Sequence, residues 1–209
     1  MSKNFILRLC RKIDMKTRPC LAPLRRRRLS NTDFSIISNN CWGGVLYEYF
    51  GLKKLSPTVG LYFYADDYIR FLSNIRYYVS LPIEMVTADK SKYAEKLRAK
   101  GQLNVPVGKL EDVEIVFLHY SNPEIARDKW IRRVKRINWD NLIVKFSYMN
   151  DATDEHIKRF AQLSFPKKFA FVTKPYPYKD VIQIPGDGQI ANDTENFSKY
   201  IDIYELINR

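Results

Sequence analysis

Short apolar runs alternate with helical spacings of apolar residues along most of this chain, from about residue 33 onward. The runs are four to six residues long and rich in β-branched and aromatic side chains, which is typical of buried strands. They cover residues 34–38, 61–64, 113–118, 142–146, 169–172 and 181–184. The pattern therefore predicts a series of short strands separated by other elements.

The segments between these runs carry apolar residues at helical spacing. Tyr68, Leu72, Ile75 and Val79 lie on one face of a predicted helix that Asp66 begins as a cap. We predict helices over residues 42–50, 66–79, 123–137, 153–163 and 194–207, with residues 91–99 helical or irregular at the surface. Alternating strands and helices predict an α/β fold of three α/β/α layers, with a mostly parallel, Rossmann-like sheet.

Positive charge is concentrated at the beginning of the chain. The 209 residues have a formal net charge of +12, and residues 1–30 hold ten basic side chains and one acid, Asp14. We therefore divide the chain into a basic N-terminal arm, residues 1–30, and a single α/β domain, residues 31–209. The hydrophobic fraction of 45% and charged fraction of 28% are those of a globular protein.

The arm suggests a partner of opposite charge. Arg8, Arg11 and Lys12 interrupt the short apolar stretch near the start, so it does not resemble a secretory signal. We expect a cytoplasmic protein, peripheral at the inner face of the membrane if the arm contacts an anionic lipid surface. The same charges would bind nucleic acid non-specifically, but no specific nucleic-acid-binding motif accompanies them. An arm that is disordered and has no partner is the remaining alternative.

Three cysteines and two histidines show no spacing typical of a metal site, so no metal is expected. The chain also lacks the glycine-rich motifs of dinucleotide-binding and P-loop proteins. No cofactor is identified from the sequence. The oligomeric state is also left open.

The segment from Asn39 to Gly44 has the most unusual composition, since two amides, a thiol, an indole and two glycines follow a strand and precede a helix. In parallel sheets, ligands bind beyond the carboxyl ends of the strands. Asn39 and Asn40 are then candidates for binding substrate. The backbone of Gly43 and Gly44 could approach an anion closely at the helix start. A tight turn around a buried Trp42 explains the same residues without any function.

His119 and Tyr120 follow another predicted strand, so they belong to the same edge. His119 is a candidate general base, and Cys41 is a candidate nucleophile if the two side chains meet. A satisfied core histidine and an inert cysteine are the alternatives. Trp42 and Tyr120 could stack on sugar rings, because both side chains combine a flat apolar face with a polar edge.

Charged side chains in two further places are candidates for binding phosphate. Arg133 and Arg136, with Lys129, share one face of a predicted helix, where guanidinium groups match phosphate oxygens. A solvated helix face is the alternative. The pair Asp66–Asp67 is similar to acid pairs that hold a metal and a nucleotide sugar, but its place at a helix start favours a capping role.

Several motifs in a fixed order resemble the domain-of-unknown-function family 1919. They are FSIISNNCWGG at 34–44, GL at 51–52, SPTVGL at 56–61, DYI at 67–69, PVG at 106–108, VEIVFLHY at 113–120, KW at 129–130, RR at 132–133, RIN at 136–138 and NL at 141–142. The resemblance covers about residues 30–175. The family is often labelled as exopolysaccharide or capsule biosynthesis proteins, which implies a role in building bacterial surface glycans.

Residues and resemblance together lead to two function hypotheses. The first is a transferase that uses a nucleotide-sugar, lipid-linked sugar or acyl-CoA donor, with His119 as base and arginines balancing phosphate charge. The second is a non-catalytic carbohydrate-binding or scaffold protein held near the membrane.

Overall fold

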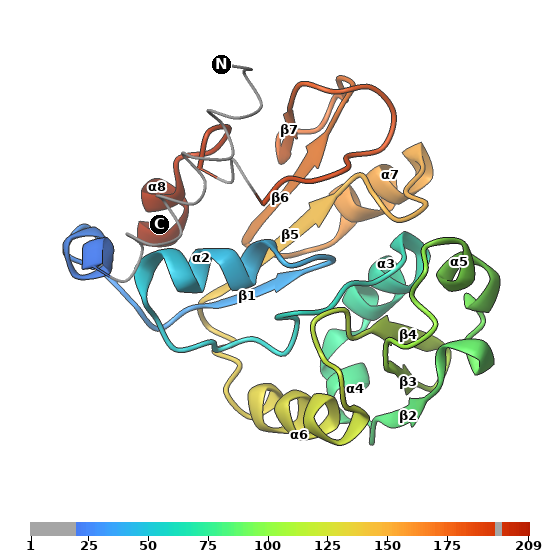
Figure 1. Ribbon diagram of the computed structural model, residues 1–209. Helices are drawn as coiled ribbons and strands as arrows, with labels where there is room; N and C mark the ends of the chain where they lie inside the picture. The colour runs from blue at the N-terminus through green and yellow to red at the C-terminus, as the bar shows by residue number, and fades with distance from the viewer. Residues whose placement is uncertain (1–19, 195–197) are drawn as a thin grey trace, which may run out of the picture.

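A parallel sheet of four strands forms the centre of the computed structural model, which describes residues 20–194 and 198–209. Its strands are β1 (Ser35–Ser38), β5 (Leu142–Ser147), β6 (Lys167–Val172) and β7 (Val181–Gln183), and they lie in that order (Figure 1). Each neighbouring pair is parallel, with Ile37 opposite Val144 and Phe146 opposite Ala170. The prediction of a mostly parallel sheet is confirmed.

Alternate residues of these strands point to opposite faces, and each face builds its own core. One core contains Ile36, Ile143 and Phe169 and is covered by helices α2 (Trp42–Phe50) and α8 (Ile203–Asn208). The other contains Val144 and Phe146 and is covered by α3 (Ala65–Ser73) and α7 (Asp154–Gln162). The sheet is therefore the middle of three layers, as predicted.

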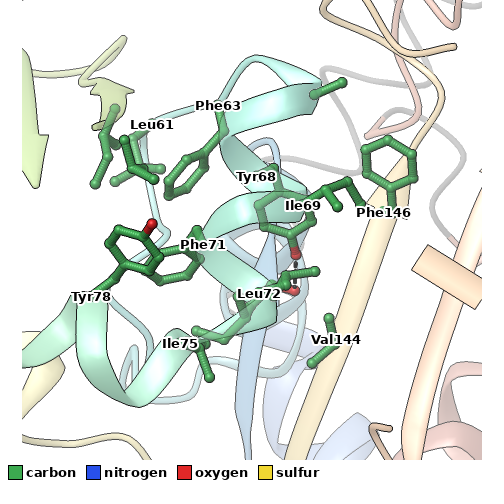
Figure 2. Packing of buried hydrophobic residues seen from close by; sticks show 14 of the residues in the cluster. Leu61, Phe63, Tyr68, Ile69, Phe71, Leu72, Ile75, Tyr78, Val144 and Phe146 are labelled. Carbon is green, nitrogen blue, oxygen red and sulfur yellow. Dashed lines mark hydrogen bonds between the residues drawn. The ribbon is translucent and has the colours of Figure 1, made fainter. Parts of the chain in front are cut away.

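Aromatic residues of α3 fill much of the second core. Figure 2 shows Tyr68 beside Phe146 of β5, with Phe71 and Phe63, which lies just before α3, on its other side. The hydroxyl of Tyr68 lies 3.0 Å from the carbonyl oxygen of Ile37 and 2.9 Å from that of Lys145. This contact joins α3 to both β1 and β5, directly beneath the strand ends that carry the candidate site.

Strand β1 lies at the edge of the sheet, yet all four of its residues are buried. Side chains satisfy its outer backbone groups. The Tyr47 hydroxyl accepts from Ile36 N–H at 3.1 Å and donates to Phe34 O at 3.0 Å, while Thr58 Oγ1 accepts from Ser38 N–H at 3.1 Å and donates to Ile36 O at 3.3 Å. The edge of β1 is thus closed by hydroxyl groups.

A second, antiparallel sheet lies beside the first (Figure 1). It consists of β2 (Glu84–Val86), β3 (Val107–Leu110) and β4 (Val113–Val116), and helices η1 (Ala88–Lys90) and α5 (Ala94–Ala99) connect β2 to β3. The run at residues 113–118 therefore does not join the parallel sheet, because the tight turn at Glu111 and Asp112 pairs it with β3. Tyr62, from the run at 61–64, pairs with Val116 as a single bridge.

Two predicted helices are shorter than expected. The helix expected over residues 66–79 is broken at Asn74 (φ −147°) into α3 and α4 (Ile75–Ser80). The helix expected from residue 194 begins only at Ile203 as α8, where the Asp202 side chain accepts hydrogen bonds from the first turn. The helix α6 (Pro123–Val134) begins at its predicted proline, with Asn122 as cap.

The described part of the basic arm contacts the domain. Residues 20–26 are helical, Ala22 is buried, and Arg26 Nη1 donates to the carbonyl of Phe50 at 2.8 Å. Ser30 N–H donates to Asn208 Oδ1 at 2.8 Å. Residues 20–30 of the predicted arm therefore contact the domain, and residues 1–19 lie outside the described residues. Throughout the described ranges, no helix is long and apolar enough to cross a membrane.

Candidate functional site

One cavity opens at the carboxyl ends of β1 and β5, where parallel sheets bind ligands, and a second adjoins it between α2, residues 54–60 and α6. The first has a volume of about 270 Å³, and its polar lining includes four amides and two hydroxyls together with Lys100, His119 and Asp193. Its lining residues are Asn40, Cys41, Tyr62, Lys100, Gln102, Leu118, His119, Met149, Asn150, Ala191, Asn192, Asp193 and Thr194. We call it the amide cavity. Neutral amides and hydroxyls are the groups that pair with the hydroxyls of a sugar.

The second cavity also has a volume of about 270 Å³, but its polar lining is mostly cationic. Lys54, Lys129 and Arg133 contribute positive charge, and Glu48 contributes one negative charge that pairs with Lys54 at 2.8 Å. The remaining lining residues are Cys41, Gly44, Val45, Val59, Gly60, His119 and Tyr120. We call it the cationic cavity. Cys41 and His119 border both cavities.

The segment of residues 59–61 brings Cys41 and His119 to this common border. His119 N–H donates to the carbonyl of Gly60 at 3.0 Å, and Cys41 Sγ lies 3.8 Å from the carbonyl of Leu61. Gly60 has φ +79°, and a Cβ there would lie 3.0 Å from the Tyr120 ring. The positive φ angle and the short distance to Tyr120 both favour glycine at position 60. His119 thus reaches the same border as Cys41, but it follows β4 of the antiparallel sheet and not a strand of the parallel sheet as the strand-end argument assumed.

Burial and the nearby Asp193 carboxylate raise the pKa of the Cys41 thiol from 9.0 to about 11. The thiol is therefore protonated at neutral pH, and a protonated thiol is a poor nucleophile. This opposes the predicted role of Cys41 as a nucleophile. His119, in contrast, is exposed at the border and is available to a ligand in either cavity.

We expect Cys41 to react slowly with iodoacetamide at pH 8 and its rate to rise about tenfold per pH unit towards pH 11. The reason is that only about one thiol in a thousand is ionised at three units below its pKa. Mass spectrometry of the Cys10→Ser variant would measure both remaining cysteines. The exposed Cys20 serves as the control for reagent access. Rapid alkylation of Cys41 at pH 7 would contradict the raised pKa.

A buried ionic network lies beneath the amide cavity. Lys145 of β5 is fully buried and its Nζ bonds to the Asp193 carboxylate and the Ser147 hydroxyl, which itself donates to Asp193. Asn40 Nδ2 donates to Asp193 Oδ1 at 2.7 Å, and Lys145 Nζ lies 3.2 Å from Asn40 Oδ1. The network joins the loop after β1, the end of β5 and the segment before residue 194.

Burial lowers the pKa of Lys145, and the Asp193 carboxylate opposes that effect. Sequence reasoning missed this network, although one signal was present: Lys145 interrupts the otherwise apolar run at residues 142–146. A cation that points into a core needs a buried anion. Nothing local identified Asp193 as that anion, since it lies 48 residues away.

Of the two predicted asparagines, Asn40 borders the amide cavity. Its Oδ1 also accepts a hydrogen bond of 3.2 Å from the N–H of Trp42, the first residue of α2. Asn39 is fully buried and exchanges two hydrogen bonds of 2.9 Å with the backbone of Ser147. Its amide thus extends the pairing of β1 with β5. Asn39 is not open to a ligand, so its predicted binding role is wrong.

The predicted roles of Trp42, Gly43 and Gly44 also change. Trp42 is fully buried against Phe169 at a ring-centroid distance of 5.3 Å, so it cannot stack on a sugar. A Cβ at Gly43 would lie 2.9 Å from Ile36, and one at Gly44 would lie 3.0 Å from Val59. The glycines therefore serve the close approach of α2 to β1 and to residue 59. Only Gly44 of the two borders a cavity.

Of the remaining candidates, Arg133 borders the cationic cavity as a charged group, whereas Tyr120 supports it and Arg136 lies elsewhere. The Tyr120 hydroxyl donates to Val59 O at 2.7 Å and accepts from Arg133 Nη1 at 2.5 Å, and its ring is buried. Tyr120 therefore orients Arg133 in the wall of the cationic cavity and is not a stacking platform. Arg136 is half-buried and borders neither cavity, which removes it from the site.

The pair Asp66–Asp67 belongs to the first turn of α3 and not to its cap, which is Tyr64. Asp67 is fully buried, bonds to Lys92 Nζ at 2.6 Å and accepts from Glu114 N–H at 2.8 Å. It joins α3 to the antiparallel sheet. Residues 20–194 and 198–209 contain no group of three or more His, Cys, Asp or Glu placed to hold a metal ion.

Comparison with known proteins places these residues in a family. The model of the domain of unknown function DUF1919 matches residues 13–208. The chain belongs to the DUF1919 family. The match includes part of the basic arm and the final segment, so it is longer than the 30–175 range expected from the motifs. An uncharacterized protein from Haemophilus influenzae is 33% identical over 190 residues, covering 87% of this chain and 86% of the relative.

Proposed function

We propose that this DUF1919 protein transfers a sugar from a phosphate-bearing donor during the synthesis of a bacterial surface polysaccharide. The observation that carries the proposal is the pair of adjoining cavities of different chemistry, with His119 at their border. A glycosyl donor has the same two parts, a charged phosphate and a neutral sugar. The exopolysaccharide role comes from the family resemblance alone.

In this proposal the donor phosphates occupy the cationic cavity and the sugars occupy the amide cavity. Arg133 and Lys129 supply donors and charge to the phosphate oxygens. Asn150 and Gln102 supply both hydrogen-bond donors and acceptors to sugar hydroxyls. Asn40 borders the cavity, but its amide is engaged by Asp193, Trp42 and Lys145, so it supports the wall and does not bind the sugar directly. The donor could be a nucleotide sugar or a lipid-linked sugar, since both carry the same phosphate chemistry.

The reaction follows from the position of His119. Its imidazole accepts the proton of the acceptor hydroxyl, whose oxygen forms a new bond to the anomeric carbon of the donor sugar. The bond between that carbon and the phosphate oxygen breaks, and the phosphate group leaves with the electron pair. Lys129 and Arg133 balance the charge on that leaving group.

The alternative is a carbohydrate-binding protein without catalysis, which would use the same amide cavity. It predicts binding of free oligosaccharides without any contribution from donor phosphates. The burial of Trp42 and Tyr120 leaves the amides and hydroxyls of this cavity as its contacts.

We expect one class of nucleotide sugar or other phosphate-bearing sugar to raise the melting temperature of the protein by about 5–11 °C. A ligand at about 100 times its Kd adds about 2.7 kcal/mol to the free energy of unfolding. Differential scanning fluorimetry against nucleotide sugars, free nucleotides, acyl-CoAs and oligosaccharides measures this shift. Lys129→Ala should weaken donor binding about tenfold, which is about 1.4 kcal/mol.

The matched control is Lys135→Ala, which removes an exposed lysine immediately after the same helix and outside both cavities. A response to oligosaccharides alone would favour the binding protein, and a response to acyl-CoA alone would move the proposal to acyl transfer. An unchanged melting temperature with every ligand would contradict both cavities as binding sites.

A further inference from the structure

We infer that the helix of residues 20–26 and the arginines after it form a docking surface for an anionic lipid bilayer. The surface consists of Leu21, Leu24, Arg27 and Arg28, and we call it the basic-apolar face. All four side chains are exposed. The inference concerns a different part of the molecule from the two cavities, so it stands or fails independently of the proposed transferase activity.

The helix is fixed to the domain in an orientation that exposes its leucines. Ala22 is only 2% exposed, whereas Leu21 and Leu24 are 41% and 57% exposed. Arg26 Nη1 donates to the carbonyls of Phe50 and Gly51 at 2.8 and 3.0 Å, which holds the helix against the end of α2. Two neighbouring leucines therefore face outward on a helix whose other face is occupied.

The arginines beside these leucines stack on tyrosines of the domain. The guanidinium of Arg25 lies 3.8 Å from the ring centroid of Tyr49, and that of Arg28 lies 3.7 Å from that of Tyr204. A groove of about 540 Å³ lies alongside, lined by Tyr49 and residues 198–204. Tyrosine and arginine beside exposed leucine is the combination found where proteins meet the headgroup region of a bilayer.

Charge favours an anionic surface as the occupant. Residues 1–30 carry a net charge of +9 out of the +12 of the whole chain, and no acidic residue lies between residues 20 and 30. Each Lys or Arg near an anionic membrane strengthens binding by roughly fivefold, which corresponds to about 1 kcal/mol. A nucleic acid would use the arginines but not Leu21 and Leu24, so the leucines favour lipid.

The test is co-sedimentation of the full chain with phosphatidylglycerol vesicles and with phosphatidylcholine vesicles. We expect binding to the anionic vesicles only, weakened by salt. Arg27→Glu with Arg28→Glu should reduce the affinity at least about 30-fold, because two favourable charges are removed and reversed. Leu21→Ser with Leu24→Ser should reduce it about tenfold. The leucine variant should keep the melting temperature of the wild type, and the arginine variant, which loses the stacking of Arg28 on Tyr204, should melt within about 4 °C of it.

Matched controls use exposed residues elsewhere: Arg127→Glu with Arg132→Glu on α6, and Leu103→Ser, whose leucine is also 41% exposed. These controls should bind anionic vesicles within about threefold of the wild type. Equal binding to both kinds of vesicle would overturn the inference. So would full binding by the leucine variant, because the surface would then be a general polyanion site that RNA or heparin could occupy.

Discussion

Asp193→Ala should lower the free energy of unfolding by about 3–5 kcal/mol. The change removes the anion that pairs with the fully buried Lys145 and leaves that cation without compensation. Asn40 and Ser147 lose a hydrogen-bond partner in the same step. For a chain of this length the melting temperature should fall by about 6–20 °C, which thermal or urea unfolding would measure.

Two comparisons make this result specific. Asp187→Ala changes an exposed aspartate close to Asp193 in the chain and should stay within about 0.5 kcal/mol of the wild type. Lys145→Met combined with Asp193→Leu should recover part of the loss, since apolar pairs often replace buried ion pairs at little cost. A loss below 1 kcal/mol in Asp193→Ala would contradict the buried pair.

The same variant has an expected pH dependence. Burial lowers the pKa of Lys145 below 10.5, so between that lowered pKa and 10.5 the unfolded chain binds more protons than the folded protein. Stability contributed by this group therefore increases as pH rises through that window. Without Asp193 the pKa falls further and the window widens. The defect of Asp193→Ala should consequently be smaller at pH 10 than at pH 7.

His119→Ala should lower the rate of sugar transfer about 10²- to 10⁴-fold while leaving donor binding within a few-fold of the wild type. The imidazole is proposed to take a proton in the reaction, and general bases contribute rate enhancements of that size. The measurement is release of the phosphate leaving group from the donor identified by the melting-temperature shift. Because His119 is exposed, its removal should have little effect on folding.

His156→Ala is the matched control, since His156 belongs to the first turn of α7 and borders neither cavity. Its loss should lower stability through the helix start but not the transfer rate. If His119→Ala transfers sugar as fast as the wild type, His119 is not the base. If donor binding is lost together with the rate, His119 acts in binding.

The sequence predicted the parallel sheet and the edge that carries the site because both depend on local patterns. Strand runs and turn residues are local, and they placed Cys41 directly after a strand of that sheet. His119 reaches the same cavity from the end of β4 in the antiparallel sheet. The sequence did not predict the antiparallel sheet, because the turn at Glu111 and Asp112 has no glycine or asparagine to mark it, although Glu111 adopts φ 53°. Sequence analysis also proposed that Trp42 binds ligand. The composition of residues 39–44 does not reveal that the Trp42 side chain packs against Phe169 in the core.

Features that depend on contacts between residues far apart in the chain could not be predicted from the sequence. The sequence suggests that the Asn39 amide binds a ligand, but both polar atoms of that amide bond to the backbone of Ser147, 108 residues away. Arg133 and Arg136 look equivalent on a helix, but only Arg133 meets Tyr120 and Val59. In each case the decisive contact is tertiary, and local propensity carries no information about it.

The hydroxyl groups that close the edge of β1 also bear on self-association. A strand from another molecule could pair with β1 only by displacing the four hydrogen bonds made by Tyr47 and Thr58. Such displacement would expose two buried hydroxyls, which opposes growth of the sheet from one molecule to the next. Fibril formation and strand exchange through this side of the sheet are therefore suppressed even in a concentrated solution.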